Sequence, residues 1–339
     1  MKSSTKEKTI DGPKDMASAS LRRGPLIGAI TNPRWVLLVP FLLFVGAITA
    51  VSPSFLGIDN ILQVLRQISV PGLIALGVTF VVICGRLDLS VGALLSLTTV
   101  TVIGLHDRFG PLGAIAACMG VGLAVGAVNG ILVAYWRLNS LLVTLAMMSI
   151  IMSVTRIVTG GKSASMSTDT GWFSQLGGGY VFGIPIPVYI FLGAAVVLSV
   201  FLTRTTFGRR VFAVGGNETA SEFSGFRSKA VIFGAYLLSG AMTGVAAVIL
   251  GSRTMAAQLE IGSGYEMNVF AAIILGGTSL LGGAGGIWRT VCGVAVLGLL
   301  QNGLLQVGLP YYTQWLVTWA ILIVAVWVDL ASGRGRVWA

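Results

Sequence analysis

Charged side chains are scarce in this sequence. Of its 339 residues, 10% are charged and 55% are hydrophobic. A soluble domain carries roughly 25% charged residues, and so few charges cannot cover the surface of a water-soluble fold of this length. The composition therefore excludes a soluble domain, including a nucleic-acid-binding one despite the net charge of +10, and predicts an integral membrane protein in the lipid bilayer.

Residues with catalytic or metal-binding chemistry are equally few. The only histidine, His106, stands beside Asp107 and is expected in a short outer loop as an interface residue. The three cysteines are far apart in apolar runs without disulfide or metal spacing: Cys84, Cys118 and Cys292. We therefore predict no catalytic residue, no metal site and no cofactor, and the protein is not expected to be an enzyme.

One short motif resembles part of a nucleotide-binding loop. Gly161-Lys162-Ser163 has the ending of a phosphate-binding loop, but the glycine required five positions before Gly161 is replaced by Arg156. Such a loop also follows a strand and opens a helix, and the surrounding apolar segments predict neither. The sequence therefore excludes ATP binding by this chain.

Long apolar runs dominate what is present. A spanning helix needs about 20 mostly apolar residues, and ten segments qualify or come close: 35–51, 70–84, 88–105, 111–134, 138–158, 188–203, 230–251, 266–281, 287–308 and 312–330. The amphipathic stretch 59–69 is expected to extend the second span outward. Residues 1–34 form a polar cytoplasmic tail, 35–330 the transmembrane domain, and 331–339 a short cytoplasmic tail.

The cations predict the orientation. With both termini in the cytoplasm, five of the 22 Lys and Arg residues fall outside and the other 17 inside; the outer ones are Arg66, Arg108, Arg156, Lys162 and Arg253. Cytoplasmic loops carry an excess of such residues. We therefore expect an all-α integral membrane protein with about ten spans and cytoplasmic N- and C-termini.

Polar residues within the spans are mostly neutral. Four amides, Asn129, Gln301, Asn302 and Gln306, are candidate pore-lining residues, and hydrogen bonding between helices is the alternative. The acids nearest the spans, Asp88, Glu266 and Asp329, are expected at the membrane interfaces. An ion-driven secondary transporter or channel would need an ionisable site in the membrane, and a membrane enzyme would need a cluster of His, Asp or Glu.

Glycine marks both helix packing and turns. Gly122, Gly126 and Gly130 recur every four residues, as do Gly240 and Gly244, which predicts close approach of helix backbones. Asp88 or Ser90 can cap the helix that follows them. Leu275–Gly286 is so rich in glycine that it predicts a broken or tightly turned backbone at the membrane, which is tolerated only when it is buried in protein or lines a cavity.

Three motifs together resemble a known family. They read Leu87-Asp88-Leu89-Ser90-Val91-Gly92, then Gly215-Gly216-Asn217-Glu218 with Ser224-Gly225, then Leu275-Gly276-Gly277-Thr278-Ser279-Leu280 with Gly282-Gly283. In this order, over about residues 35–330, the chain resembles the ribose/arabinose/xylose-type permeases of ABC importers. The resemblance implies a type II-like, binding-protein-dependent sugar permease of the bacterial inner membrane. It departs from the family where Arg86 and Arg289 replace small residues.

The resemblance also implies partners. These are a cytoplasmic ABC ATPase, a periplasmic sugar-binding protein and a second permease copy or paralogue forming a dimer. ATP hydrolysis in the partner would drive translocation of a monosaccharide or related polyol, and a secondary transporter or channel for a small polar solute is the alternative. The structural turn motifs would comprise Asp88, Ser90, Gly92, Gly276, Gly277, Thr278, Ser279, Gly282 and Gly283.

The loop between Arg204 and Lys229 is expected to contact the ATPase. Asn217 and Thr219 are good N-caps, Thr219 with Glu222 forms a capping-box pattern, and Gly225 is a natural helix stop. A two-turn helix is marginal alone and needs a surface to dock on, either the ATPase or the rest of this chain. The expected coupling residues are Gly215, Gly216, Asn217, Glu218, Ser221, Glu222, Ser224 and Gly225.

Overall fold

The computed structural model describes residues 33–310 except 168–170, and residues 312–317, 319–320 and 323. The chain divides into two compact units, Met1–Leu43 and Phe44–Ala339. Of the first unit the structure describes only the beginning of helix α2, Pro33–Val51. The predicted last span and Asp329 lie mostly or wholly outside the described residues.

The second unit is built of helices. The elements after α2 are η1 (Pro53–Leu56), α3 (Ile58–Ile83), α4 (Val91–Gly130), η2 (Ile131–Tyr135), α5 (Ser140–Thr159), β1 (Ala164–Ser165), α6 (Trp172–Gly178), β2 (Tyr180–Val181), β3 (Ile184–Pro185), α7 (Ile186–Arg204), α8 (Thr206–Gly216), α9 (Glu218–Phe223), α10 (Ser228–Thr254), β4 (Ala256–Ala257), α11 (Tyr265–Leu275) and α12 (Ile287–Gln306). Among the described residues, six helices are long and apolar enough to cross a membrane.

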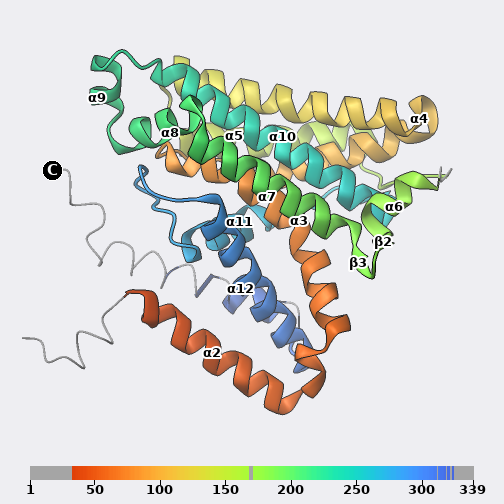
Figure 1. The fold of residues 1–339 in the computed structure, drawn as a ribbon. Helices are drawn as coiled ribbons and strands as arrows, with labels where there is room; N and C mark the ends of the chain where they lie inside the picture. The colour runs from red at the N-terminus through yellow and green to blue at the C-terminus, as the bar shows by residue number, and fades with distance from the viewer. Residues whose placement is uncertain (1–32, 168–170, 311, 318, 321–322, 324–339) are drawn as a thin grey trace, which may run out of the picture. The chain divides into compact units, whose positions relative to one another are not determined.

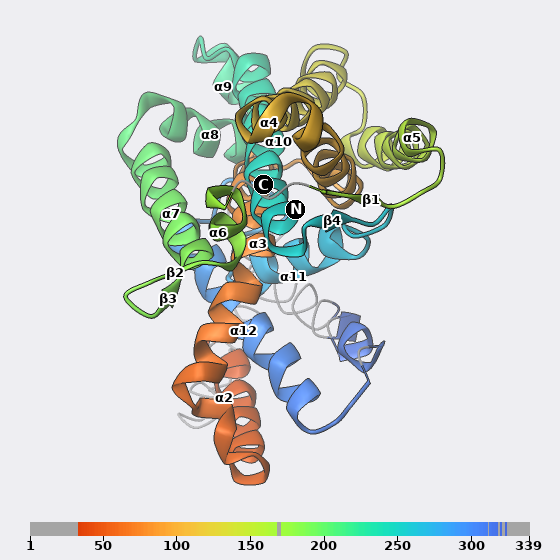
Figure 2. The ribbon, with the colours of Figure 1, turned by 90° about the vertical axis from the view of Figure 1, so that its right-hand side faces the viewer.

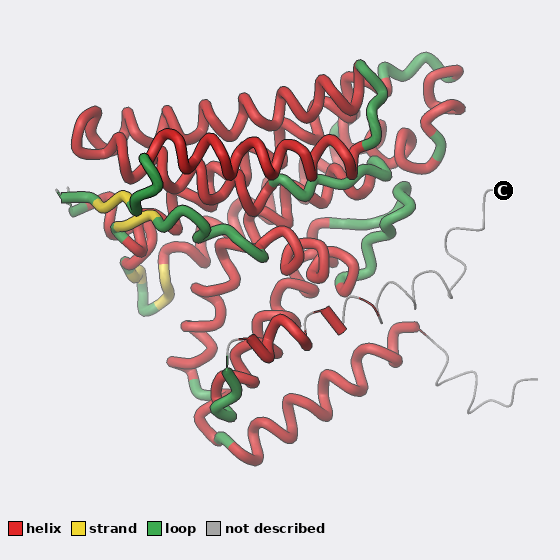
Figure 3. The backbone as a smooth tube through the Cα atoms, turned by 180° about the vertical axis from the view of Figure 1, so that it is seen from behind, coloured by secondary structure: helices red, strands yellow, loops and turns green. Residues whose placement is uncertain are grey.

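Four two-residue strands are the only sheet structure in the described ranges. β1 pairs with β4 and β2 with β3, both antiparallel. Figure 3 shows them gathered at one end of the long helices, and Figure 1 shows α8 and α9 at the other end. The segment between the predicted spans 138–158 and 188–203 contains the short helix α6 and the β2–β3 hairpin.

Helix α4 is two helical segments that fold back on each other. At Gly110 the backbone has φ 69° and ψ 171°, and Pro111 follows. A straight helix from Ser90 to Asn129 would be about 58 Å long, yet the Asn129 Nδ2 donates a hydrogen bond to Ser90 Oγ over 2.9 Å. The two separate spans predicted at 88–105 and 111–134 correspond to these two segments, which pack side by side (Figure 1).

Helix α10 is the centre of the core, among α3, α4 and α6 (Figure 2). The glycine stripes predicted for close packing face each other here. A Cβ added to Gly122 would lie 2.5 Å from the Gly240 carbonyl oxygen, and one added to Gly126 would lie 2.5 Å from that of Tyr236. Because real side chains cannot approach so closely, glycine is what lets α4 and α10 touch through their backbones.

The structure contradicts one predicted span and confirms the extension of another. The eighth predicted span, 266–281, is wrong, because α11 ends at Leu275 and a non-helical segment runs to Gly286. Gly277, Gly282 and Gly283 in that segment have positive φ angles, which glycine adopts readily and which end a helix. The expected extension of the second span by the amphipathic stretch 59–69 is confirmed, since α3 begins at Ile58 and runs to Ile83.

Two residues also lie elsewhere than expected. His106 is not in a loop at an interface; it is inside α4, 2% exposed, and its ring centre lies 4.9 Å from that of Phe173. The last turns of the first segment of α4 therefore bury it against α6. Cys84 and Cys118 are buried as expected, whereas Cys292 is exposed in the isolated chain.

Candidate functional site

Two of the sequence motifs meet the turn that leads into the third at the α8–α9 end of the molecule. The Gly283 N–H donates to the Ile83 carbonyl oxygen over 2.9 Å. A Cβ on Gly215 would collide with that same oxygen, and one on Gly282 would lie 2.7 Å from the Gly215 oxygen. The turn after α3, the end of α8 and the glycine-rich segment before α12 thus form one backbone contact, which we call the three-turn junction.

A neighbouring glycine brings the segment between α11 and α12 into contact with α12. A Cβ on Gly276 would lie 2.1 Å from the Arg289 carbonyl oxygen, so α11 ends in backbone contact with the start of α12. Thr278 and Ser279 are buried. The Arg289 guanidinium donates to the Gly277 carbonyl oxygen over 3.4 Å, so this departure from the family pattern is accommodated by the turn beside it.

Of the two predicted N-caps of helix α9, the structure has Asn217 and not Thr219. The Asn217 side chain accepts a hydrogen bond from the Ala220 N–H over 2.8 Å, and the helix starts at Glu218. The capping box of Thr219 and Glu222 is wrong, because Thr219 is already inside the helix. The predicted stop is present: α9 ends at Phe223 and Gly225 has φ 82°.

Two arginines form ion pairs with α9. The Arg86 Nη2 lies 2.5 Å from Glu218 Oε2, and the Arg137 Nη2 lies 3.2 Å from Glu222 Oε1. Partly exposed pairs of this kind contribute about 0–1 kcal/mol each, so their main effect is to orient the helix. Through them α9 is joined to the turn before α4 and to the turn before α5.

The outward surface of α9 carries one large apolar side chain. Phe223 is 89% exposed, whereas Ser221 is 5% exposed and faces the chain itself. Ser224 and Gly216 are exposed. Among the predicted coupling residues, Ser221 is therefore the one that the structure turns away from solvent.

The Asp88 motif builds a buried polar cluster. Asp88 accepts from Ser90 Oγ over 2.6 Å and from Ser239 Oγ of α10 over 2.8 Å, and Ser90 accepts from Asn129. The buried carboxyl is thus held by hydrogen bonds from two serines. The cluster fastens the α3–α4 turn to α10.

Two of the acids expected at membrane interfaces are buried within the protein. Asp88 is 2% exposed and Glu266 is 6% exposed. Glu266 Oε2 would lie 1.9 Å from a Cβ on Gly92, so the predicted motif glycine makes room for that carboxylate.

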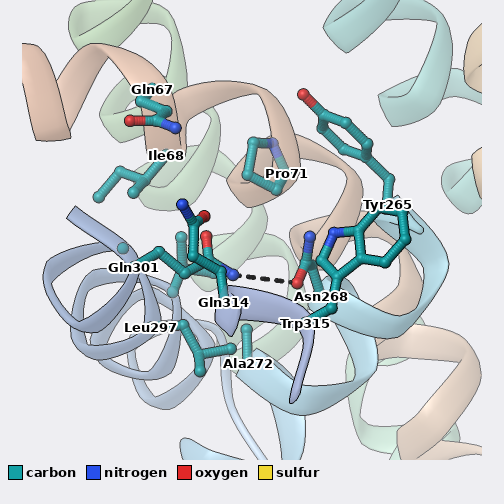
Figure 4. A pocket seen from close by; sticks show the side chains of 12 residues that line it. Gln67, Ile68, Pro71, Tyr265, Asn268, Ala272, Leu297, Gln301, Gln314 and Trp315 are labelled. Atoms are coloured by element: carbon teal, nitrogen blue, oxygen red, sulfur yellow. Dashed lines mark hydrogen bonds between the residues drawn. The ribbon is translucent and has the colours of Figure 1, made fainter. Parts of the chain in front are cut away.

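The four candidate pore amides separate into two groups. Gln301 lines a cavity between α3, α11 and α12 and donates to Asn268 Oδ1 over 3.1 Å (Figure 4). Asn302 exchanges hydrogen bonds with Asn60. Gln306 accepts from Ser52 over 2.7 Å, and Asn129 belongs to the Asp88 cluster. The last three thus bond between helices, and Gln301 alone of the four faces the cavity.

The cavity contains polar residues that sequence reasoning missed. Gln67, Asn268 and Gln314 line it with Gln301. The available signal was the same as for Gln301, a neutral amide within or beside an apolar run. Among the described residues, no group of three or more His, Cys, Asp or Glu could hold a metal ion.

Comparison with known proteins finds a matching family and several similar permeases. Residues 60–326 match the family described as branched-chain amino acid transport system / permease component. The chain is 36% identical over 297 residues to the ribose import permease protein of Escherichia coli (strain K12), covering 86% of this chain and 92% of that protein. No solved structure matches it.

Two further relatives cover similar shares. The ribose import permease protein of Bacillus subtilis (strain 168) is 39% identical over 295 residues, 86% of this chain and 91% of that protein. The L-arabinose ABC transporter permease protein of Azospirillum brasilense is 33% identical over 320 residues, 93% of this chain and 92% of that protein. With its long apolar helices, the chain therefore belongs to the ribose/arabinose-type family of ABC transporter permeases, multi-pass proteins of the bacterial inner membrane.

Proposed function

We propose that this chain is the membrane-spanning subunit of a binding-protein-dependent ABC importer and carries a monosaccharide or related polyol. The observation that carries this proposal is the similarity to ribose and L-arabinose permeases over more than four-fifths of both chains. The energy comes from ATP hydrolysis in a cytoplasmic partner. A periplasmic binding protein delivers the sugar, and a second permease copy or paralogue completes the pore.

The proposed contact with the ATPase is the α8–α9 segment. The exposed Phe223 offers an apolar anchor on its outer surface. Movement of α9 would pull on Arg86 and Arg137 through their ion pairs, and Arg86 lies two residues from the buried Asp88. The three-turn junction adds a backbone connection to α3 and to the segment before α12. A displacement of the α8–α9 segment would therefore act directly on four long helices, α3, α4, α5 and α12.

The proposed topology has ten spans with both termini in the cytoplasm. It comprises the tail 1–34, the permease domain 35–330 and the tail 331–339. The placement of α9 with Arg86 and Arg137 at one end, and of the Arg156–Glu260 ion pair near the strands at the other, supports the cation-based assignment of an inner and an outer end.

Reconstitution tests the proposal. Proteoliposomes containing this chain, its ATPase and the sugar-loaded binding protein should accumulate sugar only when ATP is supplied, while vesicles with this chain alone should accumulate none. Uptake by the complete assembly without ATP would overturn the assignment.

The buried carboxyls favour one alternative, an ion-driven secondary transporter. Asp88 and Glu266 are ionisable groups inside the helical core, where such groups often mark ion or proton pathways. The ABC proposal treats both as structural, since Asp88 is hydrogen-bonded to two serines. A proton or sodium gradient imposed on vesicles with this chain alone distinguishes the two, because gradient-driven uptake would favour the alternative.

A further inference from the structure

A cavity of about 200 Å³ lies where α3, α11, α12 and residues 314–315 meet. It is smaller than the roughly 300–1,000 Å³ of pockets for drug-sized ligands, so it suits one small ring. Figure 4 shows the amides of Asn268, Gln301 and Gln314 gathered at its centre, with Tyr265 and Trp315 to one side and Leu297 to the other.

The polar lining consists of uncharged groups with both donors and acceptors. Each of the four lining amides carries an NH₂ group and a carbonyl oxygen; they belong to Gln67, Asn268, Gln301 and Gln314. The bond from Gln301 to Asn268, 3.1 Å long, fixes two of them relative to each other. Pro71, which also lines the cavity, has no N–H, so the Gln67 main-chain carbonyl loses its helical donor and becomes a further acceptor at the same wall.

The apolar part of the lining complements these amides. Tyr265 and Trp315 present aromatic rings, and Ile68 and Leu297 present aliphatic side chains. A sugar ring has hydroxyls around its edge and C–H groups on its faces. Amides can exchange hydrogen bonds with the hydroxyls, while the negative face of an aromatic ring attracts C–H groups.

We propose that this cavity is a sugar-binding subsite in the wall of the transport path, which takes one uncharged monosaccharide ring. The inference rests on the proposed function and adds the site at which the permease itself contacts its substrate. Hydroxyls pair with Gln301, Asn268 and Gln67, and the ring stacks against Trp315.

The same lining excludes an amino acid. Among the twelve lining residues that the structure describes, there is no Asp, Glu, Lys or Arg. A bound zwitterion would leave an ammonium and a carboxylate without opposite charges, which is costly in a partly desolvated site. The subsite therefore selects sugars even though the matching family is named for branched-chain amino acid transport. Binding is weak, since a transported solute must also leave.

Saturation-transfer NMR on the purified full-length chain in lipid nanodiscs tests the subsite. D-Ribose, L-arabinose and D-xylose serve as probes and L-leucine as the comparison. We expect saturable transfer to the ring C–H protons of at least one sugar and none to leucine. Gln301→Leu should weaken that binding about fivefold, equivalent to one ordinary hydrogen bond, and Trp315→Ala should reduce the transfer to the C–H protons.

The matched control is Gln306→Leu. Gln306 is on the same helix but bonds to Ser52 outside the cavity, so this variant should bind sugar like the wild type. Equal weakening by both glutamine variants, binding of leucine, or no saturable sugar signal from the wild-type chain would each overturn the subsite. If the complete assembly still imported sugar with ATP after one of these results, the subsite alone would be refuted and the proposed function would stand. If the complete assembly imported no sugar, the proposed function itself would be contradicted.

Discussion

The backbone contact between α4 and α10 allows a sharply controlled test of packing. In Gly122→Ala the new methyl carbon would lie 2.5 Å from the Gly240 carbonyl oxygen. In Gly120→Ala, on the same helix two residues earlier, it would meet nothing within 4 Å. Both variants gain the same helix propensity, about 1 kcal/mol over glycine, so the difference between them isolates the cost of separating the two helices.

That difference can be estimated. An ordinary carbon–oxygen contact needs roughly 3.4 Å or more, so α4 and α10 must separate by up to about 1 Å, and overpacking of this kind costs about 1–3 kcal/mol. At about 2 °C per kcal/mol for a large chain, Gly122→Ala should melt about 2–6 °C below Gly120→Ala in the same detergent. The measurement is thermal unfolding of both purified variants followed by tryptophan fluorescence. Equal melting temperatures would show that the glycine contact does not hold these helices together.

Three further predictions concern the α8–α9 end and the topology. Asn217→Ala removes the cap of α9 and should weaken that helix by about 1 kcal/mol, lowering sugar-stimulated ATP hydrolysis by the assembly while membrane insertion is retained; unchanged hydrolysis would place the coupling elsewhere. Cysteine at the exposed Ser224 should cross-link to the ATPase, whereas cysteine at the buried Ser221 should not, and the reverse order would contradict the orientation of α9. Reporter fusions after Lys162 should be active outside and those after Arg210 inside, and a fusion signal of the opposite side at either point would refute the proposed topology.

Much of the helical framework was predictable because it is local. Apolar runs identify the long helices, the Gly110–Pro111 pair marks the reversal in α4, and Gly225 marks the end of α9. Each signal acts within a few residues, through burial in lipid or the backbone freedom of glycine. The glycine stripes also indicated close packing, although their mutual contact became visible only in the structure.

The site was harder to predict because it depends on segments far apart in the sequence. The position of Asp88 beside a span end was predictable, but its hydrogen bond from Ser239, 151 residues away, was not. Gln301 and Asn302 are adjacent and chemically alike, yet helical geometry turns one toward the cavity and the other toward Asn60. No pattern in a single sequence states which face of α12 meets which neighbour.

The reversal at Gly110 has a consequence for how the protein enters the membrane. The two segments of α4 follow each other with one non-helical residue between them, and they pack through neighbouring side chains such as Leu94 and Val125. A connection this short cannot cross the bilayer, so the adjoining ends of the two segments must lie on the same side of the membrane. The two segments are therefore held together as a hairpin, and they can pack against each other as soon as both are inserted.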